Sequence, residues 1–259
     1  MDMVMGKRGV VWKAPDITAD GLKMFACVCM FIQSVGIAVV ERGMIHLDQY
    51  TQESLSQAMA QDSHLMMLAG IGSVMQLIGG MAMPIFTFLL VEGFRNTSDF
   101  KKYFFSVLLF AAVSEIPYDL AVNGKLFDFS DQNAMLSMAI CLLMLYFLDL
   151  VKSRTGLAGA LLKAAIVTAS VVWAALFRTE YGLCLVLLTA IFYIFYTRNV
   201  LKTVLGMIVS LLYVTGPVAF YGIWCYNGQR KNRIPKYVYY AFYPLHLLVL
   251  ALAAKILLL

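Results

Sequence analysis

The sequence has very little charge. Only 14% of its 259 residues are Asp, Glu, Lys or Arg, whereas 61% are hydrophobic and the mean hydropathy is +0.79. A soluble domain averages about 25% charged and about 45–50% apolar residues. The shortage of charge therefore excludes an ordinary soluble domain and indicates an integral membrane protein.

The sequence also lacks the regular alternation of polar and apolar residues that a transmembrane β-barrel requires. It has instead repeated apolar runs near the ~20 residues that a helix needs to cross a bilayer. We predict an all-α, polytopic membrane bundle of about eight transmembrane helices, forming a single domain over residues 1–259. The expected spans are 22–41, 68–92, 102–122, 133–151, 157–177, 181–197, 201–224 and 237–258.

Residues typical of metal sites and disulfides are few. The chain has three histidines and five cysteines, and all of the cysteines lie in or at apolar runs. Cys27 and Cys29 would point to opposite sides of a helix, which favours small buried hydrophobes over metal ligands or a disulfide. One polar loop carries His46, Asp48, Glu53, Asp62 and His64 without metal-site spacing, so we interpret it as solvated and expect no metal.

Lys and Arg suggest an orientation, because short cytoplasmic loops carry an excess of them. An N-terminus in the cytoplasm would place there Lys7, Arg8 and Lys13, then Arg95, Lys101 and Lys102, then Lys152 and Arg154, then Arg198 and Lys202. It leaves Arg42, Lys125 and Arg178 outside, together with the basic loop "NGQRKNRIPK" (227–236). That loop contradicts the rule, so either one span near Gly216-Pro217 is miscounted or the loop is an exception.

The net charge of +5 has the same explanation in membrane topology. The sequence shows no array of basic and aromatic residues of the kind that binds nucleic acid. We therefore do not expect a nucleic-acid partner.

Two carboxylates share a face of the third predicted helix. In "SEIPYD", Glu115 and Asp119 are four residues apart, and Pro117 between them is expected to kink the helix. Gln132 and Asn133 open the next helix at the same side of the membrane, so we predict one polar cluster of these four residues. The alternative is an interfacial turn in which Asn133 is an N-cap.

His246, in "FYPLHLL", is the only histidine within a predicted span. It lies about 15 Å into a ~30 Å hydrocarbon core at the helical rise per residue. A histidine inside the membrane is a functional candidate. The alternative is a neutral imidazole that hydrogen-bonds a neighbouring helix.

Several segments resemble one family, in order along residues 19–250. They are "ADGLKMFACVCMFIQSVG", "QLIGGMAMPIFTFLLVEGFRNTSDFKKYFFSVLLFAAVSEIPYDLA", "DQNAMLSM", "EYGLCLVLLTAIFY" and "YNGQRKNRIPKYVYYAFYPLHLL". Together they resemble the TraX family, named for the conjugative-pilin acetylation protein and similar to multispanning membrane acyltransferases. The resemblance implies a protein of the bacterial cytoplasmic membrane, surrounded by membrane lipids.

The resemblance also implies a reaction. Such a protein moves an acetyl or other acyl group from acetyl-CoA or another acyl-CoA to a hydroxyl or amine. The acceptor would belong to a protein, peptide or glycan. Acyl transfer needs a base beside the acceptor and a hydrogen-bonding or positive group for the developing oxyanion.

The chain departs from the family at positions of expected chemistry. Where the family has an Asp-His pair in the first helix, this chain has Gln33-Ser34, and where the family has Gly-Arg it has Gly79-Gly80. Gln33, Ser34 and Gly80 are predicted to lie near the midplane, at the level of His246. We therefore expect weak or no acetyl transfer unless His246 replaces the missing base.

The candidate site residues follow from these arguments. The catalytic candidates are His246, Glu115 and Asp119, and the candidates for binding substrate or cofactor are Gln33, Ser34, Gly80, Glu92, Arg95, Gln132 and Asn133. Glu92 ends an apolar run, where a carboxylate is costly unless it reaches water or a cation. We expect it at the cytoplasmic boundary in an ion pair with Arg95, Lys101 or Lys102, or as an organiser of cations near a CoA entrance.

Two functions of different classes stay open. One is the membrane acyltransferase, and the other is a catalytically silent relative that binds a partner, a lipid or an acyl donor. A transporter is a weaker third interpretation, because no inverted repeat is visible.

Overall fold

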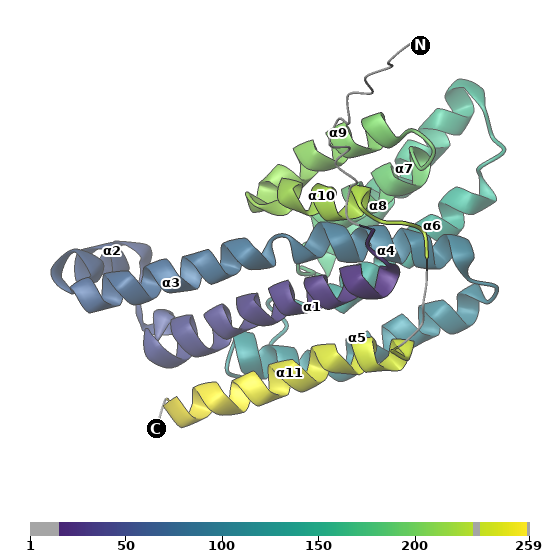
Figure 1. Ribbon diagram of the computed structural model, residues 1–259. Helices are drawn as coiled ribbons and strands as arrows, with labels where there is room; N and C mark the ends of the chain where they lie inside the picture. Colours follow the sequence, from purple (N-terminus) through teal and green to yellow (C-terminus); the bar gives the residue numbers. More distant parts are fainter. Residues whose placement is uncertain (1–15, 230–233, 258–259) are drawn as a thin grey trace, which may run out of the picture.

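A computed structural model describes residues 16–229 and 234–257, and its regular elements are helices (Figure 1). The first is α1 (Ala19–Val35), which continues without a break as a π-helix over Gly36–Met44. It is followed by α2 (Gln52–Gln61), α3 (Ser63–Gly79), α4 (Ala82–Asn96), α5 (Phe100–Val122) and α6 (Ala134–Leu150). The rest are α7 (Gly156–Leu176), α8 (Gly182–Ile194), α9 (Asn199–Ser210), α10 (Ala219–Trp224) and α11 (Lys236–Leu257). The predicted all-α class is confirmed.

Five helical segments are long and apolar enough to cross a membrane, among the residues that the structure describes. They are Ala19–Met44, Ser63–Asn96, Phe100–Val122, Gly156–Leu176 and Tyr237–Leu257. Ala134–Leu150, Gly182–Ile194 and Asn199–Tyr213 are apolar but shorter. These are the features of an integral membrane protein, although they differ from the predicted set of eight spans.

The predicted span 201–224 is wrong, because the chain turns back within it. Two short 3-10 turns, Leu211–Tyr213 and Gly216–Val218, separate α9 from α10. Pro217 has no N–H to donate to a continuing helix, and a Cβ on Gly216 would lie 2.5 Å from the Ser210 carbonyl oxygen. The Trp224 indole donates a 2.8 Å hydrogen bond to Thr203, so the end of α10 lies beside the beginning of α9. The segment is a helical hairpin.

This hairpin removes the contradiction over the basic loop 227–236. The Ile17 amide donates to the Cys225 carbonyl at 2.9 Å, and the Asn227 amide donates to the Ile17 carbonyl at 3.0 Å. The loop therefore begins beside the start of α1. Its basic residues Arg230, Lys231 and Arg233 lie outside the described residues, but the segment before them is at the same end of the bundle as the start of α1.

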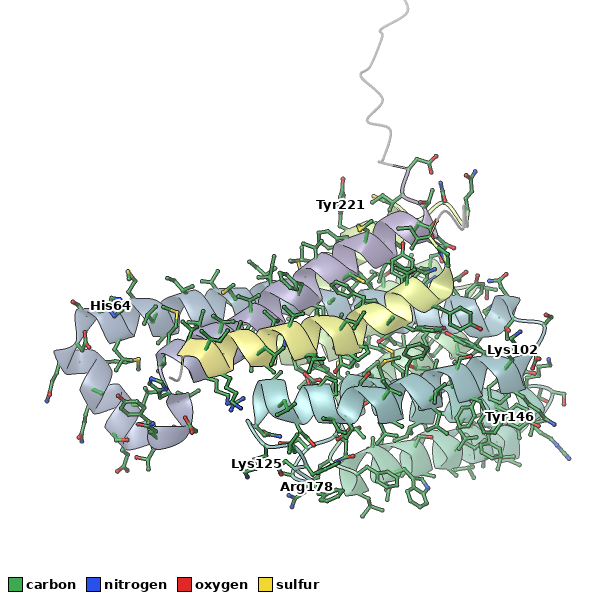
Figure 2. The ribbon with its side chains drawn as sticks, turned by 90° about the horizontal axis from the view of Figure 1, so that it is seen from below. His64, Lys102, Lys125, Tyr146, Arg178 and Tyr221 are labelled. Atoms are coloured by element: carbon green, nitrogen blue, oxygen red, sulfur yellow. The ribbon has the colours of Figure 1, made fainter. Side chains whose placement is uncertain are left out.

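We call this the N-terminal end of the bundle. It carries the start of α1, the α4–α5, α6–α7 and α8–α9 connections, and residues 225–229, whereas the α5–α6 and α7–α8 connections lie at the opposite end (Figure 1). Figure 2 shows Lys102 at one end of the molecule and Lys125 and Arg178 towards the other. Lys7, Arg8 and Lys13 fall outside the described residues. By the excess of Lys and Arg, we expect the N-terminal end to face the cytoplasm.

The centre of the bundle is formed by α4 and α8. Ile85 and Val91 of α4 and Leu185, Leu188 and Phe192 of α8 are almost completely buried. By contrast, α7 exposes large apolar side chains such as Leu157, Leu161 and Trp173 along its length. In a membrane, such a surface faces lipid tails at no cost, because hydrocarbon is as apolar as the side chains.

Labelling of introduced cysteines tests this arrangement. In a variant without the five native cysteines, Ser98→Cys and Gln229→Cys should react with a membrane-impermeant maleimide from the same face. Ser56→Cys, in α2, should react only from the other face and serves as the matched control. Reaction of Gln229→Cys from the face that labels Ser56→Cys would contradict the hairpin formed by α9 and α10.

Candidate functional site

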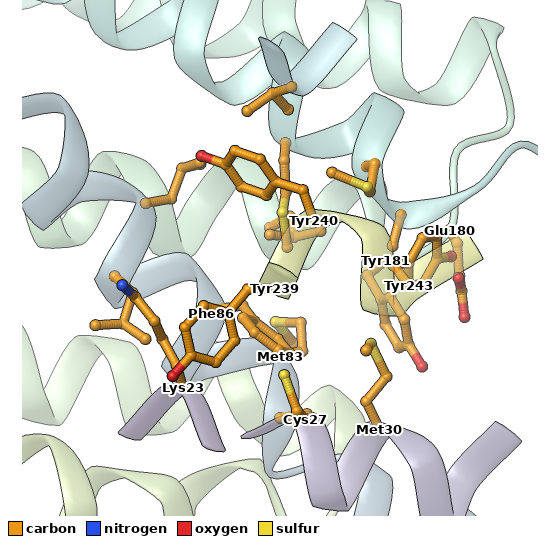
Figure 3. Close-up of a pocket in the computed structure, with 18 of the residues that line it drawn as sticks. Lys23, Cys27, Met30, Met83, Phe86, Glu180, Tyr181, Tyr239, Tyr240 and Tyr243 are labelled. Atoms are coloured by element: carbon orange, nitrogen blue, oxygen red, sulfur yellow. The ribbon is translucent and has the colours of Figure 1, made fainter. Parts of the chain in front are cut away.

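A cavity of about 680 Å³ enters the bundle from its N-terminal end. Its mouth carries Lys23 of α1, Lys102 of α5, and Asn96 and Asp99 from the connection between α4 and α5. Its inner end carries Gln33 and Ser34 of α1 with Glu180 and Tyr181 of the α7–α8 turn. The cavity therefore joins a charged entrance to a polar inner end (Figure 3).

The walls between the two ends are mainly apolar and aromatic. Met30, Met83 and Phe86 come from α1 and α4. On the opposite wall, α11 contributes Tyr239, Tyr240 and Tyr243 (Figure 3). At the mouth, the Lys23 ammonium lies 5.2 Å from the centre of the Tyr239 ring and 3.9 Å from the Asp20 carboxylate. The volume is within the ~300–1,000 Å³ of typical small-molecule sites.

Gln33 is held at the inner end by a chain of hydrogen bonds. Its side-chain amide donates to the Tyr181 hydroxyl, and that hydroxyl hydrogen-bonds the Glu180 carboxylate. Gly79 leaves the space that this arrangement needs, because a Cβ there would lie 2.3 Å from both Cβ and Oε1 of Gln33. The polar inner end is therefore built from α1, α3 and the α7–α8 turn together.

The α7–α8 turn is strained and pinned in place. Tyr181 has φ 58° and ψ 8°, a left-handed conformation that is unfavourable for an aromatic residue. The Glu180 amide donates to the Gln132 carbonyl at 2.8 Å, and the Ser137 hydroxyl donates to the Glu180 carbonyl at 2.6 Å. Such strain costs about 1–3 kcal/mol and persists where surrounding contacts determine it, often at functional sites.

Ser34 and His246, two of the sequence-predicted site residues, meet at this inner end. Ser34 Oγ lies 3.1 Å from His246 Nε2, and His246 Nδ1 lies 2.8 Å from the Phe242 carbonyl oxygen. His246 is only 5% exposed and stacks on the Phe242 ring. Ser34 lines the cavity, and the imidazole of α11 stands behind it.

The predicted polar cluster of four residues forms only in part. The Asn133 side-chain amide donates to Glu115 and to the Ala111 carbonyl, and its oxygen accepts from the Met135 amide at 3.0 Å. Asn133 is thus both the N-cap of α6 and a partner of Glu115. Asp119 accepts from the Asp128 amide at 2.9 Å.

The remaining member, Gln132, uses its backbone. It bonds to Arg178 and Glu180 of the α7–α8 turn. Glu115 and Asp119 are not among the residues that line the cavity, whereas Tyr118 between them is. The two carboxylates thus lie beside the cavity wall without forming it.

Glu92 and Arg95 belong to a different region from the cavity. Glu92 is 6% exposed, hydrogen-bonds Tyr196 and interacts electrostatically with Lys202 of α9. The Arg95 guanidinium lies 3.8 Å from the centre of the Tyr196 ring. Tyr196 and Lys202 are thus partners of Glu92 in place of the expected Lys101 or Lys102, because the start of α9 packs beside the end of α4. Lys102 stands at the cavity mouth instead.

Gly80 also faces away from the cavity. A Cβ on Gly80 would lie 2.7 Å from Thr215 Oγ1 and 3.0 Å from the Tyr213 carbonyl oxygen, in the break between α9 and α10. Gly80 does not line the cavity, whereas its neighbour Gly79 does. The prediction that Gly80 binds substrate or cofactor has no geometric support in this structure.

Sequence reasoning missed several residues of the cavity. Among the lining residues that were not candidates are Lys23, Glu180, Tyr181, and Tyr239, Tyr240 and Tyr243 of α11. One available signal was that Glu180 and Tyr181 open the segment "EYGLCLVLLTAIFY", where two apolar runs are separated by very few residues. A carboxylate and a phenol in so short a connection lie close to the interior of the bundle.

Gly79→Ala should destabilise the inner end of the cavity. The added methyl overlaps Gln33 and forces either that side chain or the backbone to move, so we expect a loss of about 1–3 kcal/mol. Gly70→Ala, in the same helix and with no heavy atom within 4 Å of the added Cβ, is the matched control and should stay within ~1 kcal/mol of the wild type. Thermal unfolding in detergent measures both. Equal stability of the two variants would contradict the close contact of Gly79 with Gln33.

Comparison with known proteins gives one family. The family described as "TraX protein" matches residues 18–254, which is most of the chain and includes every residue at the inner end of the cavity. No curated protein and no solved structure shows a significant match. The chain belongs to the TraX protein family.

Proposed function

We propose that the protein is a membrane acyltransferase that moves an acetyl or other short acyl group from acyl-CoA to a hydroxyl or amine. The observation that carries this proposal is the cavity, which runs from Lys23 and Lys102 at the expected cytoplasmic end to Gln33, Ser34 and Tyr181 inside the bundle. Membership of the TraX family, which is linked to pilin acetylation, supports it. The acceptor is a group on a protein, peptide or glycan.

The mouth of the cavity suits the phosphate-rich part of the donor. Lys23 and Lys102 stand on two different helices at the entrance, and ammonium groups bind phosphate through charge-assisted hydrogen bonds. Further into the cavity, the apolar and aromatic walls suit the narrow arm of acyl-CoA that carries the thioester. The donor would thus leave its nucleotide near the aqueous face and extend its acyl group inward.

The inner end supplies the groups that acyl transfer needs. The Gln33 amide has a second N–H besides the one directed at Tyr181, and it is available to the thioester oxygen as negative charge develops there. His246 provides a base beside Ser34. The base that the family resemblance places on the first helix is thus supplied here from α11.

A catalytically silent relative that binds acyl-CoA is the second candidate. It is favoured by Gly80, which stands where the resembled family has Arg and faces away from the cavity. Among the residues that the structure describes, no Lys or Arg at the inner end takes the place of that cation. Turnover separates the two functions. A silent relative binds acetyl-CoA without consuming it, whereas an acyltransferase releases free CoA thiol and loses that release on His246→Ala.

Lysine substitutions at the mouth test donor binding. Lys23→Ala and Lys102→Ala should each weaken acetyl-CoA binding roughly fivefold, because an exposed charge pair contributes about 1 kcal/mol. The double variant should lose roughly 25-fold if the two sites act independently. Calorimetric titration with acetyl-CoA in detergent, at low and high salt, measures the effect.

Lys101→Ala is the matched control. Lys101 neighbours Lys102 in α5 but does not line the cavity, so its removal should leave the Kd unchanged. If Lys101→Ala weakens binding as much as Lys102→Ala, the effect is a general one of surface charge. The assignment of the mouth to the donor phosphates would then be wrong.

A further inference from the structure

We propose that Ser34 is the nucleophile of a two-step transfer and carries the acyl group as an ester between the two steps. The inference rests on the proposed function, because acyl-CoA is the donor. It goes beyond that function in assigning a covalent intermediate to one named atom, Ser34 Oγ.

The hydrogen bonds around His246 fix the direction of proton transfer. The Phe242 carbonyl oxygen can only accept, so the proton that lies between it and His246 belongs to Nδ1. In the neutral imidazole, Nε2 then carries a lone pair. That lone pair faces Ser34 Oγ at 3.1 Å, so the hydroxyl donates and the imidazole accepts. A serine bonded in this way to a histidine that is oriented by a third group matches the arrangement of activated nucleophiles.

The position of His246 favours the covalent route over direct transfer. For direct transfer, the histidine would have to take a proton from the acceptor while the acyl-CoA is in place. In the resting protein Nε2 is engaged by Ser34, so it becomes free to take a proton from an acceptor only after the Ser34 oxygen has been esterified. Ser34 does line the cavity and is the group that an incoming thioester would meet.

In the first step, His246 Nε2 takes the Ser34 proton as Oγ attacks the thioester carbonyl carbon. The carbonyl oxygen becomes an oxyanion, to which Gln33 can donate its second N–H. The C–S bond then breaks, the CoA thiolate takes the proton from His246, and free CoA leaves. The products are an O-acylserine at position 34 and a neutral His246.

In the second step, the acceptor hydroxyl or amine attacks the ester carbonyl of acylated Ser34. Its proton passes to His246 Nε2, which no longer receives a hydrogen bond from Ser34 because the serine oxygen is esterified. The C–Oγ bond breaks and Ser34 Oγ takes the proton back. The acyl group is then on the acceptor, and no oxidant, reductant or metal is consumed.

The local helix geometry also distinguishes this position. The regular α-helix ends at Val35, and the π-helix begins at Gly36, two residues after Ser34. π-helical turns are rare in proteins, and those that occur lie frequently at functional sites. The change in helix type thus accompanies the residue to which we assign the chemistry.

Trapping the intermediate tests the proposal. The purified protein is mixed with acetyl-CoA in the absence of an acceptor, quenched in acid and digested for mass spectrometry. We expect one added acetyl group on Ser34, removable by mild base as expected of an ester. Release of free CoA should show a burst stoichiometric with the protein.

Variants separate a chemical from a structural role. Ser34→Ala should abolish the label, and Ser34→Cys should give a thioester that neutral hydroxylamine removes. His246→Ala should slow label formation by about 10²–10⁴-fold, the usual effect of removing a general base. Ser170→Ala, which removes a hydroxyl that donates to the Ile166 carbonyl within α7, is the control and should label like the wild type.

The outcomes distinguish this proposal from the proposed function. Binding and turnover of acetyl-CoA without a label on Ser34, and with activity kept in Ser34→Ala, would overturn the nucleophile and leave the acyltransferase standing. Failure of the folded wild type to bind acetyl-CoA would overturn both. If Ser34→Ala merely unfolds, the hydroxylamine-sensitive label on Ser34→Cys still decides, because a purely structural hydrogen bond gives no covalent adduct.

Discussion

The need to pair polar groups inside an apolar bundle determines how this structure is assembled. A polar side chain buried without a partner costs several kcal/mol in hydrocarbon, and α1 places Gln33 and Ser34 next to each other within its span. Gln33 finds Tyr181 and Ser34 finds His246. These two bonds tie α1 to the α7–α8 turn and to α11, so the same residues that form the inner end of the cavity also hold its walls together.

Several less favourable features are consequences of that pairing. The Tyr181 hydroxyl reaches Gln33 from a left-handed backbone, and the turn keeps that conformation through its bonds to Gln132 and Ser137. A residue larger than glycine does not fit at position 79, because the Gln33 side chain fills the space beside it. Strain and a glycine in a helix both lower stability, and here both adjoin one hydrogen-bonded group. Because the strained backbone of Tyr181 and the glycine at position 79 both adjoin Gln33, we infer that the inner end of the cavity has a function and is not an incidental polar contact.

Sequence reasoning identified single residues better than their partners. Composition and apolar run length are enough to predict a helical membrane bundle. His246 became a candidate as a histidine within a span, and Gln33 and Ser34 because they stand where the resemblance places an Asp-His pair. Their pairing depends on packing between segments 148 and 212 residues apart, which no local pattern reveals. The hairpin of α9 and α10 was missed because hydropathy is the same for a helix that crosses the membrane and one that turns back. Only the charge of the following loop hinted at it.

The departures from the family pattern have different meanings once the geometry is known. By the resemblance, position 34 would hold the histidine of an Asp-His pair, whereas here a serine stands at 34 and an imidazole from α11 reaches it at 3.1 Å. A base is therefore still present at the same place, although it arises from a different helix. Position 80 differs, because a Cβ there would point to Tyr213 and Thr215, outside the cavity. None of the described residues at the inner end of the cavity is basic. The negative charge of an oxyanion at the inner end must then be stabilised by neutral hydrogen-bond donors such as Gln33. A neutral donor stabilises an oxyanion less than a cationic donor does. The acyl transfer that we propose through Ser34 and His246 is therefore expected to be slower than one with a cation at the inner end.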